Sequence, residues 1–193
     1  MRTLAVGLTL VIGFAAMADD DKKKEAKKEK KPPVPVAIGA YEIKVPGDWL
    51  KQKTSGQFRK FQWGVPTAEG DDKAPVCYIS EFAGGVGGLD ANIKRWEGEF
   101  EEREGEPKKE KIEVEGFKIT ALDVTGTFKD SMGRGPFSGE KPELRKDWRS
   151  IAAMVEPEGG DTVYTFKIVG AKKSVGAQRD DFIAMLKSIK KKG

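Results

Sequence analysis

FKITALDVTGTF, residues 117–128, is the stretch that decides the fold, because its apolar residues fall on both parities of a predicted strand. Successive side chains of a strand point to opposite faces, so this pattern predicts a sheet that is covered on both faces. One parity carries Phe117, Ile119 and Ala121, and the other carries Leu122, Val124 and Phe128.

Further strands are predicted on both sides of this stretch. Residues 111–115 form a hairpin with it through Glu115-Gly116, and residues 148–155 and 162–169 form a second hairpin around Gly159-Gly160. Apolar residues again occupy both parities of 148–155, as expected of a doubly covered sheet. The upstream strand candidates are residues 41–45, 58–63 and 76–82.

Two helices are predicted from a change of period. The first has Asp90 as its cap, is stopped by Gly105 and Pro107, and presents one apolar stripe. That stripe consists of Leu89, Ile93, Trp96 and Phe100. The second closes the chain, with Ser174 as its cap and Lys190 to Lys192 beside its C-terminal dipole. Its stripe consists of Val175, Phe182, Leu186 and Ile189.

The order of elements is three strands, a helix, four strands and a helix. Strands that are neighbours in sequence pair antiparallel in such an order, and the helices cover the sheet. We therefore expect an α+β fold, with an antiparallel twisted sheet of about six or seven strands and two main helices packed on it.

The first 18 residues have the pattern of a secretory signal peptide. Arg2 precedes an apolar stretch of 13 residues, 4–16, and Ala16-Met17-Ala18 provides a small-x-small cleavage motif. Thirteen helical residues reach only about 20 Å, too short for a membrane span, so we expect cleavage after Ala18, export to the periplasm or beyond, and no transmembrane segment in the mature chain. A charged linker over 19–37 and a single domain over 38–193 follow.

The linker is rich in lysine and ends in Pro32-Pro33-Val34-Pro35, which predicts an extended spacer. Five acidic residues are interspersed, so the alternatives are a solvated tether and weak contact with an anionic surface. Residues 38–193 are almost neutral, which argues against nucleic-acid binding. The lysines concerned are Lys22, Lys23, Lys24, Lys27, Lys28, Lys30 and Lys31.

The composition excludes several kinds of site. The chain has no histidine, which removes Ser-His-Asp catalysis and imidazole metal sites. Its single cysteine, Cys77, lies in an apolar strand and is predicted to be a buried structural thiol. The acidic residues between 97 and 106 are predicted to spread over the polar side of one helix. We expect no catalytic residue, no metal and no cofactor.

Two segments are candidate binding sites. Residues 129–147 form a long predicted connection in which Met132, Arg134, Phe137 and Arg145 resemble a recognition surface for a partner protein. The alternative is that its apolar side chains fold back over the sheet edge. The second candidate is Gly87-Gly88, whose backbone N–H groups could bind an anion before the first helix, although a simple turn is the stronger interpretation.

Several motifs carry a resemblance. GGVGGLDANIKRW at 84–96, DVTGTF at 123–128 and YTFKIVG at 164–170 resemble uncharacterised exported bacterial proteins with a glycine-rich turn before an ANIxRW helix. The turn at 46–49 and the closing helix over 182–190 resemble the PsbP/Mog-like α/β/α sandwich. Named members of that fold bind other proteins, so the resemblance implies a binding scaffold but no particular partner.

The sequence therefore predicts an exported, non-catalytic binding or accessory module that recognises a protein of the cell envelope through loops. One alternative is a hydrolase using carboxylates or a Ser/Lys pair, for which Ser188 and Lys191 are the nearest candidates. Another is a surface-associated structural protein held by its lysine-rich tether.

Overall fold

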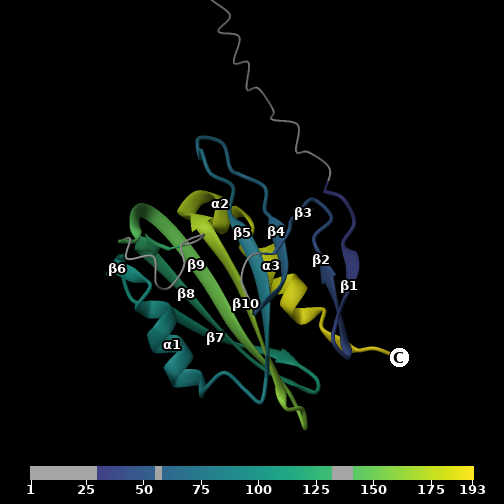
Figure 1. Ribbon diagram of the computed structural model, residues 1–193. Coiled ribbons are helices and arrows are strands. Elements are labelled where there is room, and N and C mark those ends of the chain that lie inside the picture. The colour runs from purple at the N-terminus through teal and green to yellow at the C-terminus, as the bar shows by residue number, and fades with distance from the viewer. Residues whose placement is uncertain (1–29, 55–57, 132–140) are drawn as a thin grey trace, which may run out of the picture.

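The computed structural model describes residues 30–54, 58–131 and 141–193. They form a large antiparallel sheet, a small second sheet and three helices (Figure 1). Within the described residues, no helix has the length and apolar character to cross a membrane. The strands are β1 (Val34–Ile38), β2 (Tyr41–Val45), β3 (Leu50–Lys51), β4 (Arg59–Gly64), β5 (Val76–Ala83), β6 (Phe100–Arg103), β7 (Lys108–Val114), β8 (Phe117–Asp130), β9 (Glu143–Pro157), β10 (Thr162–Ala171) and β11 (Lys190–Lys191), and the helices are α1 (Leu89–Glu97), α2 (Lys172–Ala177) and α3 (Arg179–Lys187).

The large sheet has the strand order β3-β4-β5-β10-β9-β8-β6, and β7 also pairs with β8. Both predicted hairpins, β7–β8 and β9–β10, are confirmed by antiparallel pairing. The α+β class is likewise confirmed. The main sheet of the described residues has eight strands rather than six or seven, because short edge strands β3 and β6 join it.

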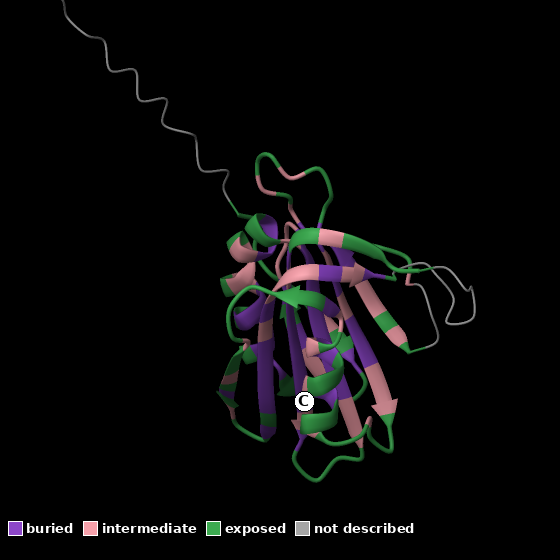
Figure 2. Cartoon of the chain, turned by 90° about the vertical axis from the view of Figure 1, so that its left-hand side faces the viewer, coloured by how far each residue is buried: buried purple, intermediate pink, exposed green. Residues whose placement is uncertain are grey.

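The predicted two-faced burial is confirmed, and each face has its own core. Phe117, Ile119 and Ala121 pack with α2 and α3, whereas Leu122 and Val124 pack with α1 on the opposite face. The central strands are buried along most of their length, while the loops are exposed (Figure 2). We call these the α3 face and the α1 face of the sheet.

The predicted boundary between linker and domain is wrong. Val34 to Ile38 form β1, which pairs with β2, and β11 completes a separate three-stranded sheet. Residues 41–45 are therefore a strand, as predicted, but not part of the large sheet. The lysines at the C-terminus extend this small sheet rather than complement a helix dipole. The ordered fold thus includes the proline segment that the sequence assigned to a spacer.

The helix boundaries also differ from the prediction. α1 ends at Glu97, because Gly98 is a poor helix former and its N–H closes the helix on the Lys94 carbonyl at 2.9 Å. Phe100 keeps its place on the apolar stripe but begins β6. Asp90 lies in the first turn and does not cap the helix, whose N-cap is Gly88.

The closing helix is interrupted at Gln178 and forms α2 and α3. Ser174 lies within α2 and is not its cap. The Ser174 hydroxyl instead donates to Asp71 at 2.5 Å and accepts from the backbone N–H of Ala68 at 2.8 Å. These bonds anchor the long β4–β5 connection to α2.

Cys77 is fully buried in β5, as predicted, and burial raises the pKa of its thiol well above the usual value. We expect a thiol reagent to leave the native protein unlabelled at pH 8 and to label it rapidly in urea. In the unfolded chain the thiol ionises above its ordinary pKa of about 8.5, whereas in the folded protein it stays protonated. The free energy of unfolding is therefore unaffected by this group below that pH and falls as the pH rises above it. Rapid native labelling would contradict this assignment.

Candidate partner-binding site

The connection between β8 and β9 is shorter than the sequence indicated. Strand pairing continues to Asp130 and Glu143, so only residues 131–142 connect the strands. Three of the predicted recognition residues, Met132, Arg134 and Phe137, lie outside the described residues. Arg145 is described, and it lies near the start of β9 with 30% of its side chain exposed.

A β-bulge decides where Arg145 points. Gly126 pairs with Trp148 and Phe128 pairs with Arg145, so two residues of β9 oppose one residue of β8. One of the two is Asp147, which has φ 54° and is the one non-glycine residue of the described chain with a positive φ. A bulge shifts the alternation of the strand, and Arg145 therefore shares the α1 face with Trp148.

Lys73, Asp130, Arg145 and Trp148 form what we call the Asp130 cluster. The Asp130 carboxylate is 6% exposed and accepts from Lys73 Nζ at 3.2 Å and from Arg145 Nε at 3.4 Å. Both cations also lie over the Trp148 ring, at 5.5 and 5.8 Å from its centroid. A buried carboxylate thus holds two partly exposed cations against an aromatic ring.

Trp148 is itself part of a packed aromatic series on the α1 face. Its ring stacks on Phe128 at 5.5 Å, and Phe128 meets Phe100 edge to face at 5.3 Å. Lys167 Nζ lies over the Phe128 ring, 5.6 Å from its centroid, and pairs with Glu99. The support of the Asp130 cluster is therefore a rigid core, which is suited to presenting a fixed surface.

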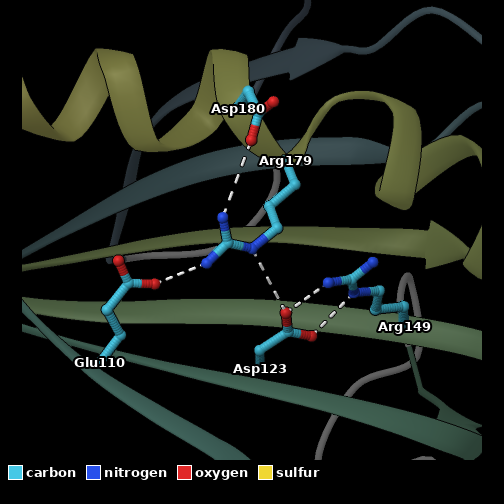
Figure 3. A network of polar contacts seen from close by, with 5 residues as sticks. All are labelled: Glu110, Asp123, Arg149, Arg179 and Asp180. Carbon is cyan, nitrogen blue, oxygen red and sulfur yellow. Dashed lines mark hydrogen bonds and ion pairs between the residues drawn. The ribbon is translucent and has the colours of Figure 1, made fainter.

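A second polar network lies on the α3 face (Figure 3). Arg149 donates to both oxygens of Asp123 at 2.8 and 2.5 Å, and this hydrogen bonding raises the pKa of its guanidinium despite burial. Arg179, the first residue of α3, lies 3.8 Å from Asp123 and 2.5 Å from Glu110. Because these charges pair with one another, the network fastens α3 to β7, β8 and β9.

The acidic residues from 97 to 106 do not share one helix, contrary to the prediction. Glu97 ends α1, and the others lie in β6 or beside it. Several pair with separate cations, as Glu104 does with Lys172 at 2.6 Å and Glu101 with Lys129 at 3.4 Å. In the described part of the chain, no three acidic or cysteine side chains gather in a metal-binding arrangement.

The glycine-rich loop before α1 is organised by Asn92, which is 2% exposed. Its side-chain amide donates to the carbonyls of Val86, Gly87 and Gly88 at 3.1–3.4 Å. The carbonyl oxygens of the two predicted anion-binding glycines are therefore turned toward the protein, and Asp90 places a carboxylate in the first turn of α1. Anion binding at Gly87-Gly88 stays an untested prediction.

Solved structures identify the architecture. The solution structure of cyanobacterial PsbP (CyanoP) from Synechocystis sp. PCC 6803 matches 83% of this chain and 93% of its own, with 11% identity and a TM-score of 0.52. The fold is PsbP-like. No protein-family model and no curated protein sequence matches the chain.

Two other solved structures are similar at lower scores. Protein PA94 of unknown function from Pseudomonas aeruginosa matches 84% of this chain and 99% of its own, with 11% identity and a TM-score of 0.47. The Ran-binding protein Mog1p from Saccharomyces cerevisiae matches 84% and 95%, with 8% identity and a TM-score of 0.47.

Sequence reasoning found one member of the Asp130 cluster and missed three. Lys73 comes from the β4–β5 connection, and Asp130 was assigned to a loop. Trp148 lies at the start of the predicted strand 148–155 and is 7% exposed, but nothing in the sequence marked it as part of a site. Lys73 and Asp130 are far apart in the sequence, so no local pattern indicates that they form an ion pair.

Proposed function

We propose that this chain is an exported, non-catalytic binding module that recognises a protein of the cell envelope at the Asp130 cluster. The observation that carries the proposal is the bulge at Asp147. It brings Arg145 to the same face as Trp148, where the guanidinium and the Lys73 ammonium lie over the ring and pair with the buried Asp130 carboxylate. Arginine and tryptophan on a rigid support are the residues that dominate binding energy in protein interfaces.

The charges of the cluster favour a protein surface over a polyanion. Glu143 pairs with Arg145 at 2.6 Å, so the cluster and its neighbour carry two acidic and two basic groups among the described residues. Leu144, which is 54% exposed, follows the alternation of β9 onto the opposite face and is not part of the cluster. A mixed surface of this kind complements a partner that offers both charges around an apolar centre.

No observation favours the hydrolase alternative. The Ser188 hydroxyl donates to the Met185 carbonyl at 2.6 Å and accepts from the backbone N–H of Lys44 at 2.8 Å. Both bonds fasten the end of α3 to β2, so this serine has a structural role. Export and the signal peptide rest on residues outside the described part of the chain and are included here as proposals.

The proposal is tested by site-specific photocrosslinking in the native host. A photoreactive residue at position 143, which pairs with Asp130 on the same face and has a 48% exposed side chain, is expected to yield one discrete protein adduct. The same residue at Leu50, also exposed but on the far edge of the sheet, yields none. Arg145→Ala is expected to lower the adduct yield at least fivefold, because the guanidinium is a central contact.

Lys118→Ala is the matched control for the loss of one exposed cation, and it leaves the adduct unchanged. Circular dichroism confirms that both variants are folded. Equal adducts from positions 143 and 50, or a yield that is insensitive to Arg145→Ala, would overturn the proposed site.

A further inference from the structure

A pocket of about 750 Å³ lies between α3 and the segment 30–33 that precedes β1. Its volume falls in the range of small-molecule sites. The floor is apolar and is formed by Trp49 and Met185, both buried, together with Pro46 and Pro66. The Trp49 indole N–H donates to Gln178 at 3.0 Å, which fixes the ring against the start of α3.

The segment 30–33, which we call the strap, forms one wall of this pocket. Lys30 Nζ pairs with Asp181 of α3 at 2.6 Å, and the backbone N–H of Lys31 donates to Asp48 at 3.3 Å. A Cβ on Gly47 would lie 2.2 Å from the Pro32 carbonyl oxygen and 2.9 Å from Lys31 Cβ. The strap therefore needs glycine at position 47, because any side chain there would overlap Lys31 and Pro32.

The polar rim of the pocket has an excess of positive charge. Lys31 and Lys44 line it, and among the described residues neither ammonium group has an acidic partner. Of the two carboxylates that also line it, Asp181 is paired with Lys30 and Asp48 accepts from the strap backbone. An apolar floor beneath two available cations complements a small molecule with an apolar body and one anionic group.

We propose that this pocket binds a small amphipathic anion, with the apolar body on Trp49 and Met185 and the anionic group at Lys31 and Lys44. The strap covers the ligand, so packing of the strap against α3 and binding of the ligand stabilise each other. This site is separate from the Asp130 cluster, and neither proposal depends on the other.

Two fluorescent probes test the proposal with residues 19–193. The anion 1-anilinonaphthalene-8-sulfonate is expected to bind saturably with one site per chain. Its neutral analogue N-phenyl-1-naphthylamine, which lacks the sulfonate, is expected to bind about tenfold more weakly. In the double variant Lys31→Gln and Lys44→Gln the sulfonate is expected to lose about tenfold in affinity, the ratio that corresponds to 1.4 kcal/mol, while the neutral probe is unaffected.

The strap is tested by Gly47→Ala, which is expected to weaken both probes at least fivefold and to speed tryptic cleavage between Lys30 and Lys31. Gly193→Ala is the matched control, because a Cβ at Gly193 meets no atom within 4 Å. Circular dichroism establishes that each variant is folded. Equal affinity for the two probes, or sulfonate binding unchanged in the double lysine variant, would overturn the anion assignment, and unchanged binding in Gly47→Ala would overturn the role of the strap.

Discussion

Trp148→Ala is expected to lower the free energy of unfolding by about 3–5 kcal/mol, the usual cost of truncating a buried aromatic side chain. Trp148 is 7% exposed and stacks on Phe128, which in turn meets Phe100. Removing the ring leaves a cavity on the α1 face and takes away the surface over which Lys73 and Arg145 lie. Urea unfolding followed by circular dichroism measures the loss.

Trp63→Ala is the matched control for this truncation. Trp63 is 3% exposed and belongs to the core of the α3 face, where it stacks on Phe61. We expect a similar loss of stability from both variants. At a temperature where both are folded, only Trp148→Ala should abolish the photocrosslink from position 143. A loss below about 1 kcal/mol for Trp148→Ala would show that the ring is not packed as described.

The Asp130 cluster could not be predicted from local sequence. Strand alternation places residues 145 and 148 on opposite faces, and only the bulge at Asp147 brings them together. That bulge depends on the register with β8, which is a long-range property. In contrast, the two-faced burial of 117–128 is contained in its own residues, and the structure confirms it.

Tertiary pairing explains the other differences. The spacing of Phe100 continues the stripe of α1, but Gly98 ends the helix and Phe100 pairs with Phe128 as the start of β6. Its burial was therefore predictable and its secondary structure was not. Similarly, Pro32 and Pro33 have the composition of a spacer, but the approach of the Pro32 carbonyl to Gly47 depends on a turn that only the folded chain brings near.

Among the charged residues that the structure describes, Lys167 is the one whose burial we expect to affect the free energy of unfolding most. It lies in β10 with 5% of its side chain exposed, and its ammonium group pairs with Glu99. A buried ammonium group loses its hydration, and this cost is offset only while a carboxylate pairs with it. The pair therefore joins the central strand β10 to the segment that leads from α1 into β6.

Glu99→Ala is expected to lower the free energy of unfolding by about 3 kcal/mol, the low end for breaking a buried pair, because the Glu99 side chain is 29% exposed and water can reach the site. Lys167→Met in the same background removes the uncompensated charge and keeps the apolar length of the side chain. The double variant is expected to recover to within about 1 kcal/mol of the wild type. Chemical unfolding of the wild type and the two variants measures this recovery. A double variant no more stable than Glu99→Ala would show that the loss does not arise from the uncompensated charge of Lys167.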